Sequence, residues 1–215
     1  MSNRTTHILV ALLTVGILAA GLALGPRLPE VMASHWNFQG QADGSMPRTT
    51  FLILVPAITA GAYLFLLLLI YVLPLGENVA SFRPQLNIFF VVFTLFLVYV
   101  QAMGLAWNLG ARFRVSVLIL PGTAALFYVL GDIMPRAKRN WLFGIRTPWT
   151  LSSDKVWTET HRLGSWIFKA SAVLMLLGVF LGQAALFFVL VPAIVGSLGT
   201  VVYSYLVWRR EPKAS

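Results

Sequence analysis

The most compact group of polar side chains near the beginning of the chain lies in the segment 26–50. It combines an imidazole, an amide and a carboxylate with an indole and a glycine, namely His35, Trp36, Asn37, Gly40 and Asp43. Gly40 and Gly44 permit backbone turns that other residues resist, so we expect the polar side chains to form one cluster. Such a cluster suits a recognition surface, a metal site or a proton site. The alternative is a structural loop whose side chains bond its own backbone; for a metal, two candidate ligands are too few.

A second and denser group lies in and just before the segment 135–165. Its members are polar, aromatic and turn-forming residues, namely Asp132, Pro135, Arg136, Asn140, Gly144, Arg146, Thr147, Pro148, Trp149, Trp157, His161 and Arg162. We expect Ser152, Ser153 or Asp154 to cap a new helix, because short polar side chains bond the free N–H groups of a first turn. On that helix Trp157 and His161 are one turn apart and share a face.

The basic and aromatic residues of this inner segment have three interpretations. They are typical of positive charge and interfacial aromatics on the inner side of a membrane. They also suit a structural clasp, in which Arg146 donates to carbonyl groups or stacks on Trp149. The third interpretation is a docking face for a cytoplasmic partner.

The sequence is poor in catalytic patterns. It contains no cysteine, nucleophile elbow, Walker loop or HExxH motif, and no membrane segment carries paired carboxylates. Asp132 is the one acid near the apolar segments, where an acid is a candidate functional residue. It also stands four residues before Arg136, at the spacing of a helical ion pair. We therefore expect no enzyme and no cofactor, and a structural pair at Asp132.

Six apolar segments must position these groups. A helix needs about 20 apolar residues to cross a bilayer, and the chain is 58% hydrophobic and only 11% charged. The predicted spans are 8–24, 51–75, 86–109, 115–134, 166–181 and 185–208. The first could be a cleaved signal peptide, but its apolar run is long and Pro26 follows directly, so we expect a retained helix. The sequence predicts an all-α polytopic protein with one membrane domain over 1–215 and a tight connection at Gly182 and Gln183.

The distribution of lysine and arginine predicts the orientation. The side with both termini carries 11 of these residues and the opposite side carries 4. Because the richer side of a membrane protein faces the cytoplasm, we expect both termini and the loop 135–165 there, and the loop 26–50 outside. The net charge of +9 is then explained by anionic lipid headgroups, and we expect no direct binding of nucleic acid.

The inner segment resembles the signature of the SdpI/YfhL-type membrane proteins. The resemblance rests on Met134-Pro135-Arg136, Asn140, Gly144-Ile145-Arg146-Thr147-Pro148-Trp149-Thr150-Leu151, Trp157 and Thr160-His161-Arg162. The outer segment, with Pro29, His35-Trp36-Asn37, Gly40 and Asp43-Gly44, resembles the N-terminal domain that accompanies this signature. Asp132 departs from the resemblance, which predicts a neutral polar residue such as Asn.

The resemblance implies a six-helix protein of the bacterial cytoplasmic (inner) membrane. It implies immunity to a secreted, membrane-damaging peptide toxin, and a receptor that holds a small DNA-binding autorepressor at the membrane. We hypothesise an immunity or signalling protein whose outer loop meets the toxin and whose inner loop docks the regulator. The rival hypothesis is a small transporter, or an enzyme acting on a lipid-like substrate. Its pocket would lie between helices kinked by the prolines Pro56, Pro121 and Pro192. The polar residues in this pocket would be Gln101 and Asn108.

Overall fold

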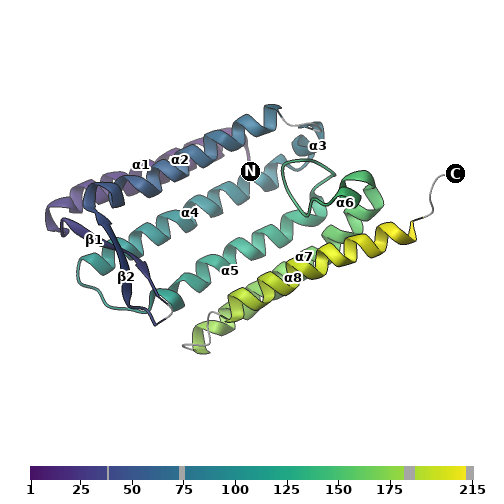
Figure 1. Cartoon of the computed structure of the whole chain (residues 1–215). Coiled ribbons are helices and arrows are strands. Elements are labelled where there is room, and N and C mark those ends of the chain that lie inside the picture. Colours follow the sequence, from purple (N-terminus) through teal and green to yellow (C-terminus); the bar gives the residue numbers. More distant parts are fainter. Residues whose placement is uncertain (38, 73–75, 182–186, 212–215) are drawn as a thin grey trace.

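Six long helices form the body of the protein (Figure 1). The computed structural model describes residues 1–37, 39–72, 76–181 and 187–211. The connection expected at Gly182 and Gln183 lies outside these residues. The long helices are α1 (Asn3–Leu24), α2 (Arg48–Val72), α4 (Arg83–Asn108), α5 (Val115–Ile133), α7 (Asp154–Gly178) and α8 (Phe187–Arg210). Each is long and apolar enough to cross a membrane, which confirms the predicted all-α polytopic class.

The fifth long helix begins well before its predicted start at residue 166. Ser153 caps α7, and its side chain accepts a hydrogen bond from the backbone N–H of Val156. The cap was expected at this place, but the helix it opens continues directly into the fifth span. The inner loop is therefore shorter than predicted, and Trp157 and His161 belong to a membrane helix.

Short elements complete the two ends of the bundle. They are the 3₁₀ helices η1 (Gly25–Arg27) and η2 (Met134–Arg136), and the helices α3 (Gly76–Ser81) and α6 (Pro148–Ser152). Thr147 caps α6 by a reciprocal pair of hydrogen bonds with Thr150, and Pro148 occupies its first turn. These short elements turn the chain at the ends of the long helices.

The long helices form two groups of three. In the first group α1 packs against α2 and α4, and in the second α7 packs against α5 and α8. Contact between α4 and α5 joins the groups. Long helices that follow one another along the chain run in opposite directions, so the beginning of α1 and the end of α8 lie on the same side of the bundle (Figure 1).

A two-stranded hairpin covers the opposite end and was not expected from the sequence. Strands β1 (Val31–Trp36) and β2 (Ala42–Pro47) pair in antiparallel fashion, with irregular register between Ala33 and Trp36. The hairpin packs on α2 and α4, and Met32 is fully buried beneath it. The segment predicted as a loop thus contains a β-hairpin.

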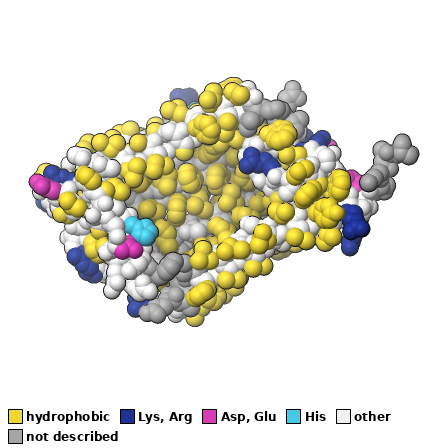
Figure 2. Space-filling model, in the orientation of Figure 1, with side chains coloured by type: hydrophobic (Ala, Val, Ile, Leu, Met, Phe, Trp, Pro, Cys, Tyr) yellow, Lys and Arg dark blue, Asp and Glu magenta, His cyan; other side chains and the backbone are white. Residues whose placement is uncertain are grey.

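The sides of the long helices are apolar and exposed, as a bilayer requires. Large exposed hydrophobic side chains include Leu64, Phe65 and Leu68 on α2 and Val195 and Leu198 on α8. Figure 2 shows one such face, which is mainly hydrophobic and is hollowed in its middle.

Candidate functional site: an outer hairpin and an inner loop

The hairpin brings together only part of the predicted outer cluster. The imidazole Nδ1 of His35 lies 2.5 Å from the Oδ1 of Asp43, and the two side chains are 73% and 43% exposed. Asn37 is separate from this pair. Its Oδ1 accepts hydrogen bonds from the backbone N–H groups of Gln39 and Gln41, each at 3.0 Å. The structural interpretation therefore holds for Asn37, and His35 with Asp43 forms an open, ionisable pair.

The two glycines of this segment serve different purposes. Gly40 lies in the turn with a φ of +80°, a conformation that other residues rarely adopt. Gly44 was expected at a turn, and this was wrong. It lies in β2 opposite His35, where an added Cβ would come within 2.9 Å of the His35 Cβ. Its missing side chain makes room for the Cβ of His35.

Asn108, at the end of α4, anchors the hairpin. Its Oδ1 accepts from the backbone N–H of Ala33 at 2.9 Å, and its Nδ2 donates to the carbonyl of Ala33 at 3.0 Å. The same Nδ2 donates to the carbonyl of Gly104 at 2.8 Å. Trp36 packs edge-on against Trp107, with ring centroids 5.6 Å apart. From the sequence, Asn108 was a candidate for the pocket of the rival hypothesis, and its role in holding the hairpin was not predicted.

A cleft opens between the hairpin and the end of α4. Its volume is about 550 Å³, and the residues around it include Pro29, Ala33, Asp43, Trp107, Asn108 and Arg112. The guanidinium of Arg112 lies 4.3 Å from the centroid of the Trp107 ring. The cleft thus offers a carboxylate and a guanidinium, which can bind both charges and main-chain groups of a peptide. In the sequence, Arg112 is only one of the four basic residues on the outer side.

On the opposite side, His161 is buried beneath the inner loop. Its Nδ1 lies 2.8 Å from the carbonyl oxygen of Trp157, and its Nε2 accepts from the backbone N–H of Ile145 at 3.0 Å. These partners require a neutral ring that carries its proton on Nδ1. The ring also stacks on Trp157, with centroids 4.0 Å apart. The predicted shared face of the helix is confirmed.

The loop above His161 is held by its own polar groups. Asn140 is fully buried, and its Oδ1 accepts from the backbone N–H groups of Leu142 and Phe143 at 2.8 and 2.7 Å. The indole of Trp157 donates to the carbonyl of Ala137 at 2.7 Å. Gly144 has a φ of +110°, and an added Cβ would lie 2.2 Å from the Nε2 of His161. Asn140, Gly144, Trp157 and His161 therefore act together to shape the loop.

Arg146 and Trp149 do not stack on each other. Arg146 donates to the carbonyl of Trp141 within the loop. Trp149 donates to the hydroxyl of Ser204 on α8 and packs edge-on against Tyr205, at 5.4 Å between centroids. Of the two predicted contacts of Arg146, the structure contains the carbonyl bond; its functional role stays a prediction.

Asp132 forms the expected ion pair with Arg136, and Lys169 of α7 lies 3.3 Å from its other oxygen. The Asp132 side chain is 42% exposed. Pro135 lies in η2 after the end of α5, and Arg162 is exposed on α7. These residues surround the inner loop at the membrane boundary.

The cavity in the structure does not lie at Gln101 and Asn108, where the rival hypothesis placed its pocket. Gln101 is buried and donates to the carbonyl of Phe51 at 3.0 Å, and Asn108 holds the hairpin. Pro56, Pro121 and Pro192 do lie inside long helices. An apolar cavity of the bundle lies elsewhere, between α2, α4 and the inner loop.

The fold and its two ends define a multi-pass membrane protein with six spanning helices. Residues 136–204 match the SdpI/YfhL protein family, and residues 12–60 match the domain of unknown function DUF1648. The chain is 24% identical over 185 residues to the protein named Immunity protein SdpI of Bacillus subtilis (strain 168), covering 85% of this chain and 86% of that one. No solved structure matches. The chain is thus similar to the SdpI/YfhL-type membrane proteins.

Proposed function

We propose that this protein confers immunity to a secreted peptide toxin, and that the toxin is met at the outer cleft. The proposal includes a place in the bacterial cytoplasmic membrane, with both termini in the cytoplasm. It further includes that the whole chain forms one membrane domain, which binds the toxin and does not act as an enzyme.

The observation that carries this proposal is the likeness to an immunity protein over nearly the full length of both chains. The outer end adds chemical support. A cationic or anionic peptide finds opposite charges in Asp43 and Arg112, and Trp107 adds an aromatic surface to the same cleft. The open His35–Asp43 pair extends this polar surface toward water.

A protection assay tests the proposal. A sensitive bacterial host would express the chain and be exposed to culture supernatant of the bacterium that naturally carries it. Expression should raise the inhibitory dose, and Asp43→Ala or Arg112→Ala should lower that dose about tenfold or more, because each removes a charged hydrogen-bonding group. Glu30→Ala and Arg114→Ala remove exposed charges that do not line the cleft, and they should protect like wild type. Absence of any protection at normal membrane abundance would reject the function.

We propose as a second function that the inner loop docks a small cytoplasmic regulator. The observation in its favour is the exposed indole of Trp141, 46% accessible, in a loop that also exposes Lys138 and Arg146. Aromatic and arginine side chains are the usual anchors of protein interfaces. Crosslinking from position 141 in intact cells should capture a small DNA-binding protein. To test Trp141 itself, the crosslinker is moved to position 138. Equal capture by the wild-type protein and by Trp141→Ala in that arrangement would contradict this role.

The transporter alternative predicts a different result. Protein reconstituted into liposomes would then move a solute, whereas an immunity protein protects without such flux. Solute-dependent flux through the wild-type protein would favour the alternative.

A further inference from the structure

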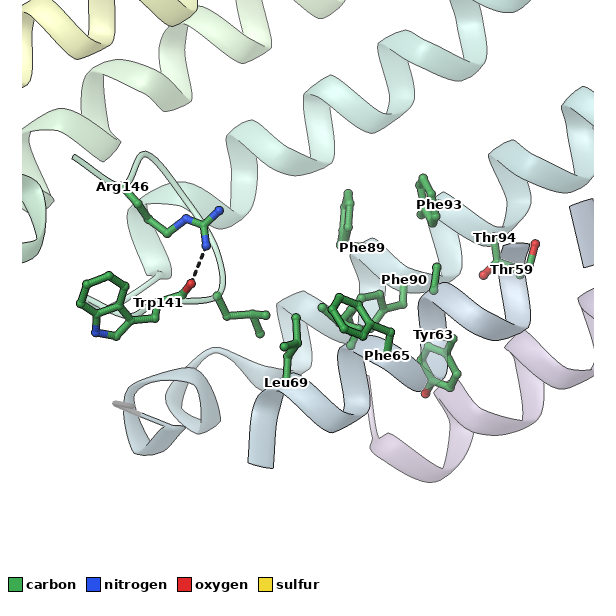
Figure 3. A pocket seen from close by; sticks show the side chains of 13 residues that line it. Thr59, Tyr63, Phe65, Leu69, Phe89, Phe90, Phe93, Thr94, Trp141 and Arg146 are labelled. Atoms are coloured by element: carbon green, nitrogen blue, oxygen red, sulfur yellow. Dashed lines mark hydrogen bonds between the residues drawn. The ribbon is translucent and has the colours of Figure 1, made fainter. Parts of the chain in front are cut away.

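A cavity of about 330 Å³ lies between α2, α4 and the inner loop. Residues from all three elements line it, among them Ala62, Phe65, Phe89, Phe93, Leu142 and Arg146. Figure 3 shows the aromatic side chains along the cavity, with Arg146 and Trp141 at one end. Since α2 and α4 are spanning helices and Phe65 is 60% exposed, the cavity is open to the hydrocarbon region of the bilayer.

Two of the three hydroxyl groups along the cavity, those of Tyr63 and Thr59 but not that of Thr94, are already bonded to other described residues of the protein. The hydroxyl of Tyr63 lies 2.8 Å from the Nδ1 of His7, and the hydroxyl of Thr59 donates to the carbonyl of Val55 at 2.8 Å. An occupant therefore meets mainly carbon surface inside the cavity, with the Thr94 hydroxyl as a polar group among aromatic and aliphatic side chains. Hydrocarbon suits such a surface.

The end of the cavity at the inner loop has the opposite character. Arg146 is exposed there, and its guanidinium has five N–H donors, of which one bond to the Trp141 carbonyl is present. None of the ion pairs among the described residues includes Arg146. A cation with free donors beside an apolar cavity is complementary to a phosphate carried by an apolar chain.

We propose that this cavity binds an anionic phospholipid, with one acyl chain between α2 and α4 and the phosphate on Arg146. The lipid enters from the leaflet on the side of the termini. This inference is independent of the toxin, and it assigns the inner loop a lipid ligand.

The size of the cavity favours an acyl chain over a peptide helix. A helix with its side chains is about 10–12 Å wide and rises about 5.4 Å per turn, so each turn fills roughly 400–600 Å³. The cavity is smaller than one turn. A single hydrocarbon chain is narrow enough to lie along Phe89 and Phe93.

Native mass spectrometry of the purified full chain in detergent tests this proposal. The probes are phosphatidylglycerol and a diacylglycerol with the same acyl chains but no phosphate. Wild type should retain one phosphatidylglycerol, at a concentration about tenfold or more below that needed for diacylglycerol, because a phosphate on a guanidinium is a charge-assisted contact.

Two variants separate the chain and headgroup contacts. Ala62→Phe fills the cavity and should reduce binding of both probes, whereas Ala60→Phe, exposed on the same helix outside the cavity, should bind like wild type. Arg146→Gln should remove the preference for phosphatidylglycerol, and Arg209→Gln should keep it.

Equal binding of phosphatidylglycerol by Ala62→Phe and Ala60→Phe would overturn the proposal, since the lipid would then lie elsewhere on the surface. So would a wild-type protein that retains phosphatidylglycerol no better than diacylglycerol, because the phosphate would then have no contact at Arg146. Because no toxin is present in this assay, its failure would leave the immunity proposal standing.

Discussion

The buried polar residues of the inner loop are bonded on nearly every side. His161 uses both ring nitrogens, and Asn140 uses its oxygen twice and its amide once. Since an unpartnered buried polar group costs about 1–3 kcal/mol, a change at one of these positions disturbs its neighbours. The inner loop therefore depends on all of these hydrogen bonds together, and single substitutions in it test the whole loop.

Gly144→Ala should destabilise the protein. The new methyl group would meet the Nε2 of His161, and alanine would be strained at a φ of +110°. Such backbone strain alone costs about 1–3 kcal/mol. The check is the temperature of aggregation in detergent, compared with Gly61→Ala, whose added methyl group has open space. A Gly144→Ala protein as stable as Gly61→Ala would contradict this packing.

Arg146→Lys should impair function while membrane abundance stays normal. Lysine keeps the charge but loses the planar set of donors that can hold the Trp141 carbonyl and a second group at once. The measurement is protection in cells with abundance determined in parallel. Wild-type protection by Arg146→Lys would reduce this residue to a charged membrane anchor.

Asp132→Asn should leave protection nearly intact and cost at most about 1 kcal/mol, as partly exposed ion pairs do. Arg136 and Lys169 bond to different oxygens of the carboxylate, and asparagine keeps one acceptor oxygen, which still serves one of these two partners. Protection and thermal stability in detergent check this expectation. Complete loss of protection by a stable Asp132→Asn protein would instead identify a proton or ligand site.

Among the elements, the outer hairpin depends most on a distant partner. Asn108 binds both backbone groups of Ala33 from the end of α4. Asn108→Leu should therefore release β1 at a cost of about 1–3 kcal/mol, since two hydrogen bonds are lost. Hydrogen exchange in 31–47 should accelerate and exchange in α7 should not.

Asn108→Asp provides the matched comparison. It keeps the acceptor for the Ala33 N–H but cannot donate to the carbonyls of Ala33 and Gly104. Its exchange should be intermediate between wild type and Asn108→Leu. Unchanged exchange in both variants would show that apolar packing around Met32 holds the hairpin alone.

The contrast between helices and hairpin explains what the sequence could predict. The six spans were found because each must cover the hydrocarbon core with apolar residues, a local and strong signal. The hairpin was missed because β2, Ala42–Pro47, contains Gly, Asp and Pro and lacks alternation, and its pairing depends on Asn108, far along the chain. His161 was placed correctly because helical spacing is local. The lipid-facing cavity had no local signal, since three separate segments line it.

For the whole molecule, the orientation in the membrane is the main expectation that a direct experiment can decide. Cysteines at Gln41 and Lys155, which are exposed at opposite ends of the bundle, should react with an impermeant thiol reagent from opposite sides of intact cells. Position 155 avoids Ser153, whose side chain caps α7. Only Gln41→Cys should be labelled from outside. Labelling of both positions from outside would reject the six-span arrangement, and labelling of Lys155→Cys alone would reverse it.

Helix α4 contacts both the outer hairpin and the inner loop. With 26 residues and about 1.5 Å per residue, it is a rod of roughly 39 Å. One end holds the hairpin through Asn108, and near the other end Phe82 and Phe89 pack against Phe143 of the inner loop. A ligand that binds more tightly to one position of α4 shifts the helix toward that position. It thereby changes the affinity of the protein for any second ligand whose binding depends on the position of α4. Thermodynamic linkage makes this change in affinity equal in both directions. If a lipid or regulator at the inner end changes the affinity for a toxin outside by some factor, the toxin changes the affinity for that lipid or regulator by the same factor.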